Sequence, residues 1–111
     1  MPIPRVEKRE LDMITLFVTY PASADASFDH DYYTTHHIPL VNSVWKPLGL
    51  ISATAFFPSP APNGNHAICE CVFEGESALQ AALASPHTPA IMDDVKNFTT
   101  IVPIILRGTA L

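Results

Sequence analysis

Glycine is scarce in this sequence, which contains four among 111 residues. No two of them fit the G-x-G-x-x-G frame that places backbone amides around phosphates, so nucleotide binding is not indicated. A G-x-S-x-G motif, typical of serine hydrolases, is also missing. No C-x-x-C or H-E-x-x-H spacing occurs, and Cys69-x-Cys71 with His66 three residues earlier is a poor zinc motif. Nothing in the sequence calls for haem or flavin, and we expect neither a metal nor any other cofactor.

Charged residues are also few, at 15% of the chain with a net charge of −5. Half of the six basic residues are Arg5, Lys8 and Arg9, so the rest of the chain is acidic and unsuited to nucleic acids or anionic membranes. No apolar run approaches a membrane span, and the N-terminal stretch lacks the apolar core of a signal peptide. Cys69 and Cys71 would share one face of a strand as buried free thiols. We therefore expect a cytoplasmic protein with no nucleic-acid or membrane partner.

The apolar content, 48%, is sufficient for one folded domain of this length. Residues 1–11, with two prolines and mixed charge, predict a flexible extension, and residues 12–111 a single domain. The hydrophobic pattern predicts four strands and three helical segments. The expected strands are 13–20, 50–57, 66–74 and 101–107, and the expected helices are 27–49, 77–84 and 89–97. Pro103 cannot donate to a ladder, so the last strand should lie at an edge, as in a βαββαβ sheet of order 4-1-3-2.

The stretch 27–49 predicts one amphipathic helix. Asp29 is suited to be its N-cap, and Gly49 to be the left-handed residue that ends it. Pro39 would remove the hydrogen bond to the carbonyl of Thr35 and kink the helix, as expected for the wall of a pocket. One face is apolar except for a phenol and an imidazole one turn apart. That face consists of Tyr33, His37, Leu40, Val41 and Val44.

Two segments of the chain stand out as motifs. The first is Phe28-Asp29-x-Asp31-Tyr32-Tyr33-x-x-x-His37-x-Pro39-Leu40, and the second is Asp94-Val95-Lys96-Asn97-Phe98-Thr99. Together they resemble the recurring motifs of the EthD family, named after a protein of bacterial ethyl tert-butyl ether degradation. The resemblance implies an α+β, ferredoxin-like βαββαβ protomer that pairs sheet to sheet as a dimeric α/β barrel. It implies little about the reaction, because few members have a defined substrate.

The expected strands carry apolar residues on both faces, whereas helices on one side would cover only one face of the sheet. In the first strand, for example, Leu16 and Phe17 belong to opposite faces. A bare apolar face of that size is unfavourable in water. We therefore expect a homodimer in which two sheets pack face to face.

His37 is the first candidate for catalysis, because an imidazole on the apolar face exchanges protons near neutral pH. The alternative is a hydrogen-bonded core histidine that fixes the helix. Tyr33 would orient His37 or donate a hydrogen bond to developing negative charge, or else serve only as an apolar staple. Asp94 would fix the tautomer of His37, as in a His–Asp pair, or else be a surface charge. We expect His37 as the base, Tyr33 as the donor and Asp94 as the orienting residue.

Five further residues are expected to bind the substrate: Tyr32, Phe17, Leu40, Val44 and Glu70. Tyr32 would lie at the pocket rim or at the dimer contact. Glu70 would be either a pocket acid, with its pKa raised by apolar neighbours, or a solvated strand residue.

These residues favour a small enzyme acting on a hydrophobic, enolisable small molecule in a pocket between helices and sheet. Isomerisation, cyclisation, decarboxylation and cofactor-free oxygenation, which is an oxidoreductase reaction, would each need only a proton acceptor and a dry pocket. The alternative is a non-catalytic accessory protein that binds a hydrophobic ligand for a partner oxygenase in a degradation pathway. A cavity that contains His37 and a second titratable group would favour the enzyme, and a filled core would favour the binder.

Overall fold

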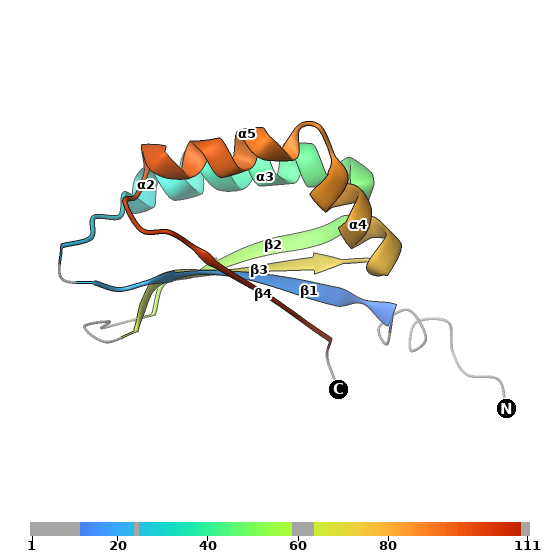
Figure 1. Cartoon of the computed structure of the whole chain (residues 1–111), viewed down its shortest axis with the longest axis horizontal. Helices are drawn as coiled ribbons and strands as arrows, with labels where there is room; N and C mark the ends of the chain where they lie inside the picture. Colours follow the sequence, from blue (N-terminus) through green and yellow to red (C-terminus); the bar gives the residue numbers. More distant parts are fainter. Residues whose placement is uncertain (1–11, 24, 59–63, 110–111) are drawn as a thin grey trace, which may run out of the picture.

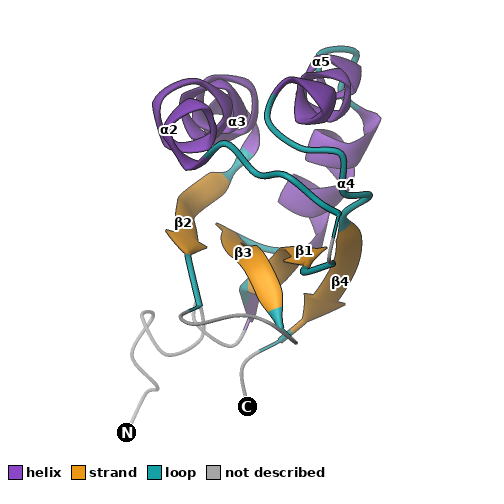
Figure 2. Cartoon of the chain, turned by 90° about the vertical axis from the view of Figure 1, so that its left-hand side faces the viewer, coloured by secondary structure: helices purple, strands orange, loops and turns teal. Residues whose placement is uncertain are grey.

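The computed structural model describes residues 12–23, 25–58 and 64–109. An antiparallel sheet of four strands carries the helices on one face (Figures 1 and 2), which confirms the α+β class. The strands are β1 (Ile14–Pro21), β2 (Leu50–Phe56), β3 (Asn65–Phe73) and β4 (Ile104–Gly108). Their order, β2-β3-β1-β4, is the expected order 4-1-3-2 read from the opposite edge. The predicted extension 1–11 lies outside the described residues.

Strand β4 lies at an edge of the sheet, as predicted, but Pro103 is not inside it. The strand begins one residue later, at Ile104, and pairs with β1 from Thr19↔Ile104 to Thr15↔Gly108. A proline lacks the N–H that a ladder needs, and here it stands just before the first paired residue.

The stretch predicted as one α-helix consists of four pieces. They are α2 (His30–Tyr32), a π-helical turn (Tyr33–His37), α3 (Ile38–Trp45) and a 3-10 turn (Lys46–Leu48). Asp29 is the N-cap, as predicted, and its Oδ1 accepts the N–H of Tyr32 at 3.0 Å. The irregularity expected at Pro39 takes the form of the π turn before it, in which the Ile38 N–H bonds to the Tyr33 carbonyl five residues back. Such turns are frequent at functional sites.

Gly49 ends this helical stretch in the left-handed conformation, with φ of 116°, as predicted. The position also allows a close approach between elements. A Cβ added at Gly49 would lie 2.4 Å from the Cβ of Ala78 in α4 (Glu76–Ala84). Only glycine therefore satisfies both the backbone and the packing at this point.

The remaining helices are α4 and α5 (Thr88–Asp94), with a 3-10 turn (Val95–Asn97) after α5. Thr88 joins three helices, because its hydroxyl donates to the Ala82 carbonyl at 2.5 Å and accepts from the Trp45 indole N–H at 2.9 Å. This fixes α3, α4 and α5 over one face of the sheet (Figure 1). In the described part of the chain, no helix has the length and apolar character needed to span a membrane.

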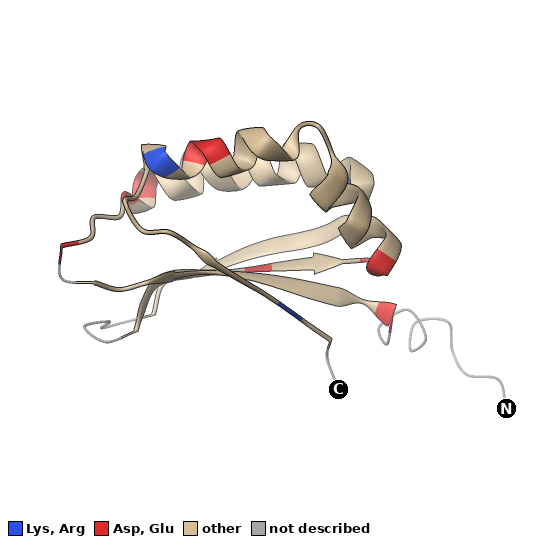
Figure 3. Ribbon diagram, in the orientation of Figure 1, with Lys and Arg blue, Asp and Glu red and all other residues tan. Residues whose placement is uncertain are grey.

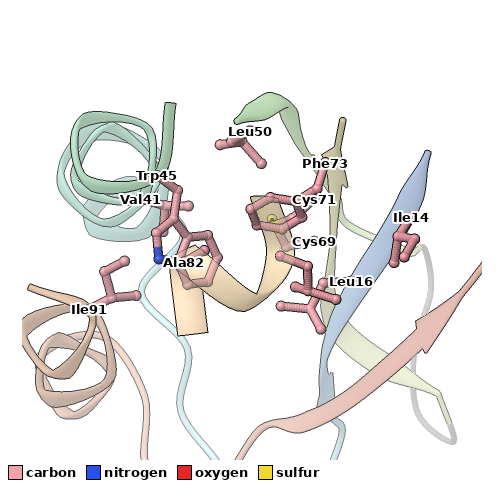
Figure 4. Packing of buried hydrophobic residues seen from close by; sticks show 11 residues of the cluster. Ile14, Leu16, Val41, Trp45, Leu50, Cys69, Cys71, Phe73, Ala82 and Ile91 are labelled. Carbon is pink, nitrogen blue, oxygen red and sulfur yellow. The ribbon is translucent and has the colours of Figure 1, made fainter. Parts of the chain in front are cut away.

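The two faces of the sheet differ in what covers them. The inner face packs against the helices, and Figure 4 shows side chains of α3, α5, β1 and β3 converging there. The labelled core residues include Leu16, Val41, Trp45, Cys69, Cys71, Phe73 and Ile91. Among the described residues, no helix covers the outer face, and its apolar side chains include Phe56, 49% exposed, and Leu106, 55% exposed.

Candidate functional site

The centre of the candidate site is a contact between the helical stretch 30–48 and the end of α5. His37 is the last residue of the π turn, and Asp94 is the last residue of α5. The His37 Nδ1 lies 2.9 Å from Asp94 Oδ2, and the histidine is only 4% exposed. Two residues 57 positions apart in the chain therefore form a His–Asp pair in which the histidine is buried and the aspartate is partly buried.

Two more residues hold the other oxygen of the Asp94 carboxylate. The Tyr32 hydroxyl donates to Oδ1 at 2.7 Å, and the Asn97 side-chain amide donates to the same oxygen at 2.9 Å. Burial tends to raise the pKa of Asp94, but the hydrogen bonds from Tyr32, Asn97 and His37 outweigh it and lower that pKa below its ordinary value. The carboxylate is thus ionised at neutral pH and fixed on both oxygens.

The ionised carboxylate determines which nitrogen of His37 carries the proton. Asp94 Oδ2 only accepts hydrogen bonds, so Nδ1 holds the hydrogen and Nε2 presents its lone pair. Nε2 has no hydrogen-bond partner among the residues that the structure describes. Burial lowers the pKa of His37, with Asp94 acting in the opposite direction, so the imidazole is neutral at neutral pH. A neutral imidazole with a free Nε2 is the form that accepts a proton.

A cavity of about 50 Å³ lies between the helices and the inner face of the sheet, and His37 lines it. Most of its wall is apolar, and Trp45 of α3 forms part of it. The polar groups that line it are Tyr20, Tyr33, His37, Cys69, Cys71 and Thr88. The Sγ atoms of Cys69 and Cys71, both free thiols, lie 3.6 Å apart.

Tyr33 stacks on His37 at the cavity wall. The ring centroids lie 5.6 Å apart with 17° between the planes, and Tyr33 is 1% exposed. Its hydroxyl has no hydrogen-bond partner within the described ranges, although Cys69 lies close by. Burial is the largest cause that raises the pKa of Tyr33, so the phenol keeps its proton and remains a donor.

The sequence profile of the EthD domain matches residues 22–101, well over half of the chain. The chain belongs to the EthD family. It is similar to an EthD-like protein of Ralstonia eutropha JMP134, with 28% identity and a TM-score of 0.78, over 88% of this chain and 91% of that one. No curated protein sequence matches this chain.

Two more distant structures share the fold of this EthD domain. SnoaB of Streptomyces nogalater, described as a cofactor-independent oxygenase, is 12% identical with a TM-score of 0.63, over 89% of this chain and 93% of that one. A dimeric protein of unknown function and ferredoxin-like fold from Bacteroides fragilis is 7% identical with a TM-score of 0.56, over 89% and 97%. At these identities the likeness shows the ferredoxin-like fold alone.

Within the EthD domain, the catalytic candidates His37, Tyr33 and Asp94 lie together, but the contacts differ from the expectation for the tyrosines. Tyr32, expected at the rim or at a dimer contact, is the one that hydrogen-bonds to the carboxylate, and Tyr33 stacks on the imidazole instead. Adjacent helical residues point in different directions, so Tyr32, the last residue of α2, and Tyr33, the first of the π turn, have different surroundings. Asn97 was missed, although its place three residues after Asp94 in a helical segment indicates the same side.

None of the five residues expected to bind substrate lines this cavity. They are Tyr32, Phe17, Leu40, Val44 and Glu70. Phe17 and Glu70 face each other across β1 and β3 on the outer face of the sheet, away from the helices. Strand alternation explains this, since their neighbours Leu16 and Cys69 occupy the inner face. Leu40 and Val44 are residues of α3 that are partly buried and pack against the core. The expected substrate contacts of all five side chains are therefore not part of the cavity wall.

Metal ligands do not gather in this EthD domain, as far as the structure describes it. No group of three or more His, Cys, Asp or Glu side chains there has an arrangement suited to a metal ion. Charged residues are sparse along the ribbon, with acidic positions on α5 beside the site (Figure 3). The described site therefore offers acid–base groups and an apolar wall.

Proposed function

We propose that this EthD domain is a small-molecule enzyme that works without a cofactor, by removing a proton from a carbon acid in the cavity between helices and sheet. The observation that carries the proposal is the partly buried His37–Asp94 pair, in which His37 lines the cavity and keeps its Nε2 free of described partners. Nε2 would take the proton, and the electron pair of the C–H bond would move to the carbonyl oxygen to give an enolate. Tyr33 would donate a hydrogen bond to that oxygen, and Asp94 would stabilise the imidazolium.

Removal of the proton to give an enolate is the first step of three candidate reactions, which are isomerisation, cyclisation and cofactor-free oxygenation. Decarboxylation reaches an enolate by loss of CO₂ instead, so the proton-removal proposal does not cover it. The experiment is solvent exchange of the α-protons of 2-octanone in D₂O, followed by NMR. This exchange needs only proton transfer. An exchange rate with the protein that exceeds the rate in buffer alone supports the enzyme. Saturable binding without exchange favours the alternative, a non-catalytic carrier of a hydrophobic ligand for a partner oxygenase.

The exchange rate should depend on pH through His37. Because burial lowers the pKa of this imidazole, the neutral base should already predominate at pH 6.5, its ordinary pKa. We expect the rate to rise with pH and to level off by about pH 6.5. Asp94→Asn, which removes the group that raises the His37 pKa, should move the midpoint further down. A midpoint above 6.5 would contradict this assignment.

We also propose that the domain is a cytoplasmic homodimer in which two sheets pack through their outer faces as an α/β barrel. The exposed apolar residues of that face and the dimeric relative from B. fragilis support it. The interface should be of the obligate class, above roughly 2,000 Å². Sedimentation that shows a stable 12.1 kDa species at micromolar concentration would overturn the dimer.

Glu70 provides a test of which face forms the dimer. It lies on β3 between Phe17 of β1 and Thr54 of β2, and the described outer-face residues include no lysine or arginine. A carboxylate buried there without a cation is unfavourable. Glu70→Gln should therefore tighten the dimer at neutral pH, by about tenfold in dissociation constant, as measured by sedimentation equilibrium. A weaker dimer would mean that Glu70 is paired across the interface.

A further inference from the structure

The wall of the cavity has no fixed charge. None of the described residues that line it is a lysine, arginine, aspartate or glutamate. Its histidine, His37, is held neutral by burial at neutral pH. A carboxylate or phosphate that entered would lose its hydration without gaining a cation. The cavity therefore selects against anions.

One donor in the cavity lacks an oxygen or nitrogen acceptor. The hydroxyl of Tyr33 is buried and makes no such hydrogen bond to any described residue, and its neighbour Cys69 offers only a thiol sulfur, which is a weak acceptor. Buried polar groups are nearly always paired in folded proteins, and an exception calls for an explanation. Beside it, the free Nε2 of His37 offers only a lone pair. An oxygen acceptor fits against Tyr33, and an acidic hydrogen fits against His37.

The enclosed volume limits what enters. One water needs about 10–15 Å³ on this measure, so about 50 Å³ holds a group of only a few heavy atoms. Part of the wall is open to solvent, through the exposed apolar side chains Leu83, Met92 and Ile105, at 48%, 44% and 47% exposure. A larger molecule would place its head inside and its apolar body over these three residues.

We infer that the ligand of this site is an uncharged carbonyl compound, whose carbonyl accepts from Tyr33 and whose apolar body covers Leu83, Met92 and Ile105. The inference rests on the proposed function in assigning the ligand to the same cavity and in choosing a carbonyl over a hydroxyl. It shares the Tyr33–carbonyl contact with that proposal, and it adds the charge and the shape of the ligand.

Trp45 makes the test direct, because it is the only tryptophan of the chain and lines the cavity. Its fluorescence is titrated at pH 7.5 with 2-octanone, 2-octanol and octanoate, which have equal chain lengths. We expect saturable binding of 2-octanone. Octanoate should bind at least tenfold more weakly than the ketone, and 2-octanol about threefold more weakly. If octanoate binds as tightly as 2-octanone, the inference that the ligand is uncharged is overturned. If 2-octanol binds more tightly than 2-octanone, the inference that the ligand is a carbonyl compound is overturned. A folded protein that shows no saturable ketone binding would overturn both.

Tyr33→Phe is the matched variant. Because its hydroxyl has no described partner, the change should leave the melting temperature unchanged or raised. It should weaken 2-octanone binding three- to tenfold and leave octanoate binding unaltered. Unchanged ketone binding would show that Tyr33 does not anchor the ligand.

His37→Gln separates this inference from the proposed enzyme. If the wild type binds 2-octanone selectively but exchanges no α-protons, the enzyme fails and the ligand class stands. If exchange occurs and is lost in His37→Gln while ketone selectivity persists in the variant, both stand. If octanoate competes as well as 2-octanone while exchange occurs, the ligand class alone fails.

Discussion

Replacing His37 by alanine is expected to reduce α-proton exchange by 10²–10⁴-fold. A positioned general base contributes about this much, equivalent to roughly 3–5 kcal/mol of barrier. The residue is suited to the role because Asp94 fixes Nδ1 at 2.9 Å and leaves Nε2 free of described partners. The measurement is the initial exchange rate at saturating 2-octanone at pH 7.5, together with the sedimentation coefficient of the variant.

The control is Asp94→Asn, which removes the carboxylate but keeps the base. It should lose less activity than His37→Ala and should shift the pH midpoint downward, an effect that a purely structural residue would not produce. If His37→Ala unfolds the protein, or leaves exchange intact in a folded protein, His37 is a core histidine. The catalytic proposal would then be abandoned.

Gly49→Ala should be among the most destabilising single-methyl changes available in the chain. A non-glycine residue at φ of 116° costs about 1–3 kcal/mol. The added Cβ would also lie 2.4 Å from the Ala78 Cβ, and overpacking of this kind costs about 1–3 kcal/mol more. We expect a loss of roughly 2–5 kcal/mol in the free energy of unfolding, measured by urea denaturation, and a melting temperature lower by about 10–20 °C.

Two variants separate the two causes. Gly108→Ala adds a Cβ that meets no atom within 4 Å and should change stability little. In the double variant Gly49→Ala/Ala78→Gly, the clash is relieved and only the backbone strain remains, so part of the loss should be recovered. If the free energy of unfolding of Gly49→Ala alone lies within about 0.5 kcal/mol of the wild-type value, the helix end shifts freely and the expectation is wrong.

Local signals in the sequence were enough to locate the strands and both ends of the first helical stretch, but not its π turn or the start of β4. Asp29 and Gly49 mark the helical stretch because capping and left-handed geometry depend on neighbouring residues alone. The strand order followed from the βαββαβ pattern and from a proline that stands at the edge strand. These features depend on backbone conformation and hydrogen bonding, which the residue types of a single sequence indicate directly.

The contacts of the site were harder to predict. The pairing of His37 with Asp94 was expected from the two family motifs, and the geometry brings them together. The hydrogen bond from Tyr32 to Asp94 was not predicted, because a contact between residues 62 positions apart depends on how α5 packs against the helical stretch, which local periodicity does not show. Phe17 and Glu70 were misplaced because apolar neighbours alone do not tell which strand face meets the helices.

Helix α5 contributes both to the cavity wall and to the His37–Asp94 pair. Its Met92 lies at the open side of the cavity. Its Asp94, two residues later, forms the hydrogen bond to the His37 imidazole. A bulky ligand that displaces Met92 would therefore also move helix α5, which carries the residue that orients His37. In the proposed enzyme, the range of ligands that enter and the orientation of the base would thus depend on the same helix, so a substitution that widens the entrance at Met92 should also change the exchange rate.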